Sequence, residues 1–473
     1  MLNRRYSRPL LAVAAVVVLA LAGCSHNDPA TLLASAKVFL AKNDAPAAII
    51  QLKNALQVAP ENAEARFLLG KALLESGGPG AAETELRKAL DLKYSADETY
   101  PLLARALLQQ GKYETLISEV ADRKFTTPQA QAEVLTSLGL ARLGLGEKKE
   151  ARTSIDAALI AKPGDLQATV ALARLAANDN DLPRALTLVD QALSTSKDDP
   201  QALQLKADVQ EAQGQHDDAI KTLGRALEVR PKAVQPRLAL VSILARNGQA
   251  ERAAKELDPL VKSMPKDPRT LYAQALVAFE RGDMNAARDA IQGVLSVAPD
   301  NLASVYLSGL INFRLASYGA AEQALRTVVA KAPGDIGARQ VLAATYMRTG
   351  RTTAALEMLE PALQAAPDNP ALLRAAAEVY LASNDPAKAA QFYERANAID
   401  KGSVEGRVRL AQVQLAAGGD ADRALKDLES IASANPSSQA ADLALISVHL
   451  RQHEIDKAIT AADALVQKQP KNP

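Results

Sequence analysis

Two histidines near the end of the chain have a spacing that could bind a metal ion. His449 and His453 fall one helical turn apart, Glu454 follows directly, and imidazole and carboxylate groups are ordinary zinc ligands. The order H-E-x-x-H is absent, however, and no third ligand lies nearby in the sequence. His449 also occupies a position that Tyr346 and Tyr380 occupy in other copies of a repeat described below. We therefore expect a structural or surface role for both histidines and no metal site.

Other residues that could carry out chemistry do not form a catalytic set. The glycine-rich stretches GGPG around Gly78 and LGLG around Gly144 lack both a preceding strand and the G-K-[ST] ending of a phosphate loop. There is no G-x-S-x-G elbow, and the chain has one cysteine. We predict that the protein is not an enzyme, with no catalytic residues and no cofactor. A hydrolase with an unrecognised site is the alternative from another functional class.

Composition argues against two classes of ligand. The 473 residues carry a formal net charge of +1, which gives no electrostatic reason to bind nucleic acid. Sugar sites usually stack rings on exposed aromatic side chains, but only 3% of the residues are aromatic and none is tryptophan. We therefore expect protein partners, with no nucleic acid and no direct binding of polysaccharide.

The first 28 residues differ from the rest of the chain. Three arginines precede the apolar run Leu10–Leu21, which is too short for a comfortable membrane span and ends in Leu-Ala-Gly-Cys24. This segment resembles the lipobox of bacterial lipoproteins, in which the signal is cut before a cysteine that is then lipidated. We predict a signal peptide over residues 1–23, then a lipidated Cys24 and a short tether over residues 24–28. An ordinary signal peptide and an uncleaved anchor are the alternatives.

The resemblance also implies a location. Ser25 stands where lipoproteins retained in the inner membrane often have aspartate. The expected location is the outer membrane, with the protein facing the periplasm and held to the membrane by its lipid anchor.

From Pro29 onward a 34-residue pattern recurs. The twentieth position is alanine in twelve of thirteen copies, with Leu116 the exception, and the closing position is proline in ten copies, Pro128 among them. The turn between two apolar stripes of helical spacing carries glycine in eight copies and asparagine in three. The copies begin at Pro29, Ala63, Asp97, Ala132, Leu166, Pro200, Val234, Pro268, Leu302, Ile336, Pro370, Val404 and Gln439. Each copy is predicted to form helix, turn, helix, turn.

This pattern resembles the tetratricopeptide repeat (TPR). The resemblance implies an all-α TPR solenoid over residues 29–473, in which thirteen repeats wind into a right-handed superhelix and the first helices line the inner surface. The bulky early position of the family is Arg339 in the copy that begins at Ile336 and is weak in most other copies. We therefore expect looser packing between helices.

The stretch from Leu32 to Glu114 resembles a narrower family. LLASAKVFLAKNDAPAAIIQLKNALQVAPENAEARFLLGKALLESG and ETELRKALDLKYSADETYPLLARALLQQGKYE look like the opening of the TPR-repeat lipoproteins of the PEP-CTERM/exosortase system, the PrsT family. The resemblance implies a periplasmic scaffold that accompanies exopolysaccharide biosynthesis and export. Members of that family are considerably longer than this chain. We expect Ile455, Ile459 and Leu465 to lie on an uncovered end, as in a truncated relative or at a terminus that a partner covers.

Side chains that could bind a partner fall at inward-facing positions of the first helices. These residues are Tyr272, Leu276, Phe279, Tyr306, Leu310, Phe313 and Met347, with Arg314 and Arg348 beside them. We call these nine residues the aromatic strip. It would suit an extended or helical peptide with apolar anchors and a carboxylate. The alternative is that positions 5 and 12 of the repeat pack against neighbouring helices.

These observations predict a periplasm-facing lipoprotein scaffold that mediates protein–protein interactions in exopolysaccharide biosynthesis or export. A general periplasmic TPR adaptor for outer-membrane protein or cell-wall machinery is the alternative.

Overall fold

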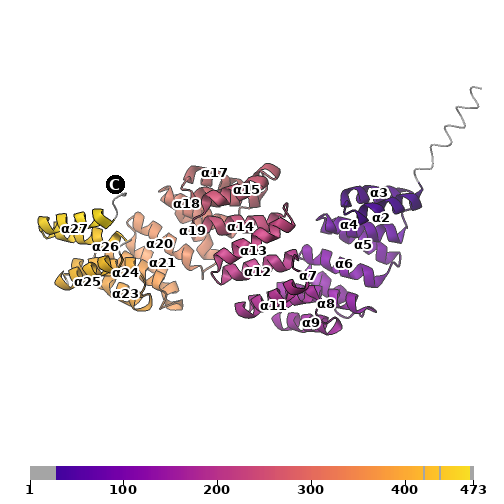
Figure 1. Cartoon of the computed structure of the whole chain (residues 1–473), viewed down its shortest axis with the longest axis horizontal. Helices are drawn as coiled ribbons and strands as arrows, with labels where there is room; N and C mark the ends of the chain where they lie inside the picture. Colours follow the sequence, from indigo (N-terminus) through magenta and orange to yellow (C-terminus); the bar gives the residue numbers. More distant parts are fainter. Residues whose placement is uncertain (1–27, 419–420, 436–437, 469–473) are drawn as a thin grey trace, which may run out of the picture. The chain divides into compact units, whose positions relative to one another are not determined.

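The computed structural model describes residues 28–418, 421–435 and 438–468. In these residues the chain forms 26 α-helices and no strands (Figure 1). The predicted signal peptide and Cys24 lie outside the described residues. The chain divides at Pro236 into two compact units, residues 1–236 and 237–473.

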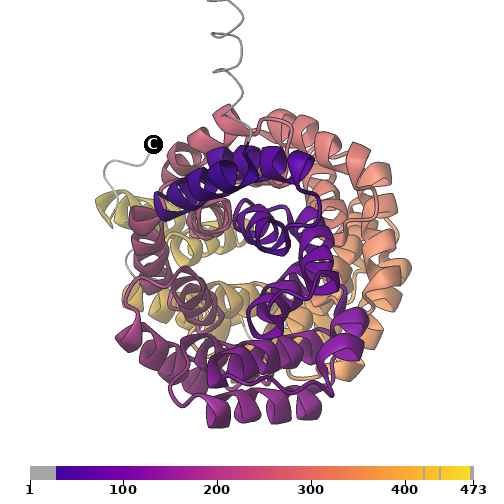
Figure 2. The ribbon, with the colours of Figure 1, turned by 90° about the vertical axis from the view of Figure 1, so that its right-hand side faces the viewer.

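The first unit contains six complete helical hairpins. Its helices are α2 (Pro29–Ala41), α3 (Ala45–Val58), α4 (Ala63–Glu75), α5 (Pro79–Asp91), α6 (Ala96–Gln109), α7 (Tyr113–Val120), α8 (Pro128–Gly144), α9 (Lys148–Ala161), α10 (Leu166–Asn178), α11 (Leu182–Thr195), α12 (Pro200–Ala212) and α13 (His216–Val229). In Figure 2 the hairpins of this unit, drawn from indigo to magenta, follow one another along a curved path.

The helix α14 (Val234–Arg246) begins at the end of the first unit, and the remaining helices belong to the second. These are α15 (Ala250–Ser263), α16 (Pro268–Glu280), α17 (Met284–Val297), α18 (Leu302–Arg314), α19 (Tyr318–Lys331), α20 (Ile336–Arg348), α21 (Thr352–Ala365), α22 (Pro370–Ala382), α23 (Pro386–Ile399), α24 (Val404–Ala416), α25 (Ala421–Ala434), α26 (Ala440–Arg451) and α27 (Ile455–Lys468).

Each hairpin is built from the residues that the repeat places at its turn. At the end of α20, Gly350 N–H donates to the Met347 carbonyl at 3.1 Å and Arg351 N–H donates to the Tyr346 carbonyl at 2.8 Å, which closes the helix in a Schellman motif. Gly350 has a φ of +74°. Where neither glycine nor asparagine is present, Ala316 and His453 adopt positive φ values of 56° and 60° at the same position. This geometry confirms the predicted turns. The turns at Ala316 and His453 are strained, because a residue with a Cβ adopts positive φ only at a cost.

Small residues set how closely the two helices of a hairpin approach. The repeat places alanine at the twentieth position, and Ala82, Ala151 and Ala321 are fully buried. At the eighth position, a Cβ added to Gly139 would lie 2.6 Å from the Ile155 side chain of the facing helix. Within each unit, second helices pack on the first helix of the next hairpin, and neighbouring first helices also touch. The first helices of the second unit therefore share one surface, which we call the first-helix face.

Two expectations about packing need correction. Pro128 does not close the third repeat, because α7 ends at Val120 and Pro128 is instead the first residue of α8. Arg339 does not loosen its repeat: it is 9% exposed and its guanidinium donates to the Pro333 carbonyl at 2.8 Å and the Met358 carbonyl at 3.0 Å. The arginine thus joins two helices and the preceding turn at the position where the family has a bulky residue.

Candidate partner-binding face of the second unit

The aromatic strip lies on three successive first helices. Tyr272, Leu276 and Phe279 are on α16; Tyr306, Leu310, Phe313 and Arg314 are on α18; Met347 and Arg348 are on α20. The structure therefore brings the predicted residues together on the first-helix face. Their exposure differs, since Leu276 is buried, the other apolar members are partly buried, and both arginines are exposed.

Most apolar side chains of the aromatic strip also pack within the fold. Tyr306, Phe313 and Met347 lie against a buried cluster that includes Leu325, Leu342 and Tyr346. The Phe313 ring centroid is 5.9 Å from that of Tyr318 on the facing helix. Burial raises the pKa of the Tyr272 phenol, an effect that Arg246 partly opposes. The partner-binding role of these side chains remains a prediction, and their packing role is visible.

The two arginines are the accessible part of the aromatic strip. The Arg314 guanidinium lies 5.5 Å from the centroid of the Phe279 ring, a cation–π contact between neighbouring repeats. Arg348 is exposed and makes no ion pair within the described part of the chain. A partner carboxylate could reach either group without displacing an internal salt bridge.

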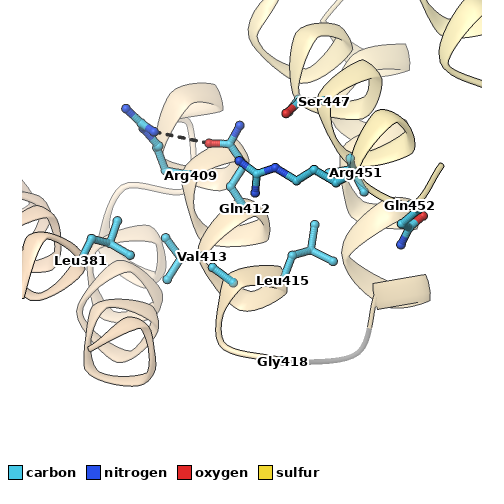
Figure 3. A pocket seen from close by; sticks show the side chains of 12 residues that line it. Leu381, Arg409, Gln412, Val413, Leu415, Gly418, Ser447, Arg451 and Gln452 are labelled. Carbon is cyan, nitrogen blue, oxygen red and sulfur yellow. Dashed lines mark hydrogen bonds between the residues drawn. The ribbon is translucent and has the colours of Figure 1, made fainter. Parts of the chain in front are cut away.

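A hollow of about 620 Å³ lies further along the first-helix face, where the sequence analysis identified no site. It is bounded by α22, α24 and α26 (Figure 3). Its lining residues are Leu381, Arg409, Gln412, Val413, Leu415, Ala416, Gly418, Ala444, Ser447, Val448, Arg451 and Gln452. We call it the arginine hollow, because its two charged lining residues are Arg409 and Arg451.

The floor of the arginine hollow is apolar and its rim is polar. Val413, Ala444 and Val448 are buried, whereas Arg409, Ser447 and Arg451 are exposed. Arg409 Nη1 lies 3.5 Å from Gln412 Oε1, a long contact that Figure 3 marks, and Arg409 Nε lies 3.6 Å from Glu378 Oε1. A hollow of this size with a few convergent polar groups has the character of a ligand site.

A buried tyrosine connects the core to this rim. Tyr393 is 2% exposed, and its hydroxyl donates to Glu378 Oε1 at 2.5 Å. Burial, followed by the hydrogen bond to Glu378, raises the pKa of the Tyr393 phenol above its ordinary value. The twenty-fourth position of the repeat is aliphatic in the other copies, so Tyr393 is a departure from the pattern that the sequence shows beside one arginine of the rim.

Two of the three residues considered for metal chemistry, His449 and Glu454, pair with each other. His449 is buried and its Nδ1 lies 2.8 Å from Glu454 Oε2, while His453 occupies the turn that follows α26. Within residues 28–418, 421–435 and 438–468, no group of three or more His, Cys, Asp or Glu side chains could hold a metal ion. Within the same ranges, no helix has the length and apolar character needed to cross a membrane.

The fold and this face define an all-α solenoid of helical hairpins. A tetratricopeptide-repeat family model matches residues 33–101, 69–123, 136–202, 272–336 and 408–473, which together make up more than half of the chain. A second tetratricopeptide-repeat model matches residues 211–277, 312–379 and 346–402. The chain therefore belongs to the tetratricopeptide-repeat family, whose repeats form scaffolds for protein–protein interaction and are typically non-enzymatic.

One solved structure supports this fold, and a second TPR structure has a lower similarity. The crystal structure of the APC/C hetero-tetramer Cut9–Hcn1 contains a chain that is 16% identical, covering 98% of this chain and 97% of that one with a TM-score of 0.53. The TPR domain of P58(IPK), in a 2.5 Å crystal structure, is 19% identical and covers 82% of this chain and 98% of that one, with a TM-score of 0.32. Among proteins with curated descriptions, none has a significant sequence match.

Proposed function

We propose that this protein is a periplasm-facing scaffold that is anchored in the outer membrane through lipidated Cys24. Its partners are components of exopolysaccharide biosynthesis or export associated with a PEP-CTERM system. The lipobox-like segment before Cys24 supports the anchor, and the PrsT-like stretch from Leu32 to Glu114 supports the pathway. Binding of protein partners follows from the repeat family.

The observation that carries the binding role is the arginine hollow on the first-helix face of the second unit. It combines a buried apolar floor with an accessible cationic rim, which is the usual anatomy of a site that holds a partner side chain. The aromatic strip on α16, α18 and α20 presents Arg314 and Arg348 on first helices of the same unit. An extended partner segment would contact both regions.

Crosslinked cells provide the test of the pathway. The lipidated full-length protein serves as bait, a Cys24→Ser variant serves as the control without an anchor, and captured proteins are identified by mass spectrometry. We expect export-channel or polysaccharide-synthesis proteins with the wild type, and we expect their loss with the variant. Capture of outer-membrane assembly or cell-wall proteins alone would contradict the proposed pathway and favour a general periplasmic adaptor.

A further inference from the structure

Both charged residues among the described lining of the arginine hollow are positive. Arg409 and Arg451 both line it, and none of its twelve lining residues is acidic. Arg451 forms no salt bridge with any described residue, and Arg409 has one contact with a carboxylate, 3.6 Å from Glu378. The three groups together carry a net charge of +1. An anionic group that enters the hollow would therefore meet a favourable potential.

The carboxylate beside Arg409 is tied to the core by a tyrosine. A buried hydroxyl is costly unless it is hydrogen-bonded, so the Tyr393–Glu378 pair is strongly favoured. Glu378 Oε1 accepts this hydrogen bond and lies 3.6 Å from Arg409 Nε, so the carboxylate stays beside Arg409. A side chain that is already ordered loses less entropy when it binds a ligand, which increases the affinity. Tyr393 is thus a positioning residue for the rim.

The apolar floor indicates the chemistry of the uncharged part of the ligand. Val413, Ala444 and Val448 form a buried apolar base, and Leu381 and Leu415 flank it. None of the twelve described lining residues is aromatic, so they offer no ring on which a sugar could stack. The volume lies within the ~300–1,000 Å³ range of ligand pockets. The site thus fits an amphipathic group with one negative charge.

We propose that the arginine hollow docks a partner-protein segment that places an aspartate or glutamate side chain between Arg409 and Arg451. A neighbouring large apolar side chain of the same segment rests on the floor. This proposal rests on the protein-binding role proposed above and specifies the chemistry of its partner. Charge complementarity decides the occupant, because the hollow is cationic and accessible and the repeat family binds proteins.

The test is selection from a library of random 12-residue peptides displayed on phage, with the purified full-length chain as the target. We expect the selected peptides to be enriched in Asp or Glu next to Leu, Ile, Phe or Tyr. The variant R409Q/R451Q should lose this enrichment. A matched control, R288Q/R326Q, removes the same charge from the second helices α17 and α19 and should retain it. Circular dichroism checks that all three proteins are equally helical.

A selected peptide then gives affinities. We expect R409Q/R451Q to weaken its binding by about 10- to 100-fold, as for loss of charge-assisted hydrogen bonds. Tyr393→Phe should weaken the binding of the acidic peptide several-fold. It should leave unchanged the affinity for the same peptide with its Glu replaced by Gln or its Asp by Asn. A merely structural role of Tyr393 would lower both affinities equally.

The outcomes separate the two proposals. Selected peptides without acidic enrichment, or with equal enrichment in R409Q/R451Q, would overturn this inference and leave the scaffold role intact. Failure to select any peptide would also overturn it, and failure to capture any partner from cells would overturn the scaffold role as well.

Discussion

The aromatic strip and the arginine hollow both lie on first helices of the second unit, and they differ in the space that they leave open. In the strip, large side chains such as Phe313 fill the space between helices and meet partners such as Tyr318. In the hollow, Ala416, Ala444 and Ser447 are small, and a volume of about 620 Å³ remains. The difference shows that bulky residues on these first helices fill the space between helices, while small residues beside arginines leave a hollow open.

The comparison predicts its largest effect for Phe313→Ala. A buried Phe→Ala change costs about 3–5 kcal/mol, and because Phe313 is partly buried we expect about 2 kcal/mol of local stability to be lost. Arg451→Ala in the hollow should change stability by less than about 0.5 kcal/mol. Hydrogen exchange followed by mass spectrometry measures both locally, because repeat arrays need not unfold in one step. Equal effects of the two changes would remove the distinction between the regions.

A second prediction compares two tyrosine hydroxyls. Tyr393→Phe removes the buried hydrogen bond to Glu378 and should cost about 1.5 kcal/mol in exchange protection of α22 and α23. Tyr306→Phe in the aromatic strip should cost less than about 0.5 kcal/mol, because no hydrogen bond of its hydroxyl is found among the described residues. If Tyr306→Phe is the more costly change, the positioning role of Tyr393 loses its support.

A third prediction concerns the turn between α18 and α19 in the strip. Ala316 has a φ of 56°, a region that costs a residue with a Cβ about 1–2 kcal/mol. Ala316→Gly should therefore stabilise this hairpin by about 1 kcal/mol, whereas Gly418→Ala beside the hollow should destabilise its hairpin by a similar amount. Hydrogen exchange of the two hairpins in the two variants measures both signs. A destabilised Ala316→Gly protein would show that this turn is not strained.

The smallest effect is a difference in acid sensitivity. Asp267 accepts a hydrogen bond from the Arg269 backbone at the start of α16, and its bonds to Arg269 hold its pKa at about 2, below its ordinary value. The stabilisation is therefore present above the unfolded pKa near 4 and is lost as the pH falls through about 2. The start of α24 is capped by the Ser403 hydroxyl, which does not titrate in this range.

Protection factors corrected for intrinsic exchange measure this difference. We expect protection near Arg269 to fall between pH 4 and pH 2 while protection near Gly406 changes less. An equal decline at both sites would indicate general acid unfolding instead of the loss of one cap.

The fold was predictable because the repeat acts locally. Glycine or asparagine determines each turn, and alanine allows the two helices of a hairpin to cross. Both act on residues within about twenty positions of the chain, and the same pattern recurs in thirteen copies. Arg339 was misjudged because its partners, the Pro333 and Met358 carbonyls, are backbone groups that no residue type identifies.

The site was predictable only in part. The residues of the aromatic strip could be placed on one face from the repeat register. Whether the Phe313 ring is available to a partner depends on its contact with Tyr318 across the hairpin. The hollow depends on small residues from α24 and α26 that become neighbours only when the hairpins stack. Tyr393, a phenol in an otherwise aliphatic position, is a departure from the pattern that the sequence shows beside one arginine of the rim.

Photo-crosslinking in cells tests the central claim most directly, namely that partners bind the first-helix face of the second unit. A photoreactive phenylalanine is placed at Gln412 in the arginine hollow, at Arg348 in the aromatic strip, and at the exposed Arg326 on the second helix α19 as a control. We predict that the same partner is crosslinked from Gln412 and Arg348 and not from Arg326. Crosslinking from Arg326 alone, or equally from all three positions, would contradict the account.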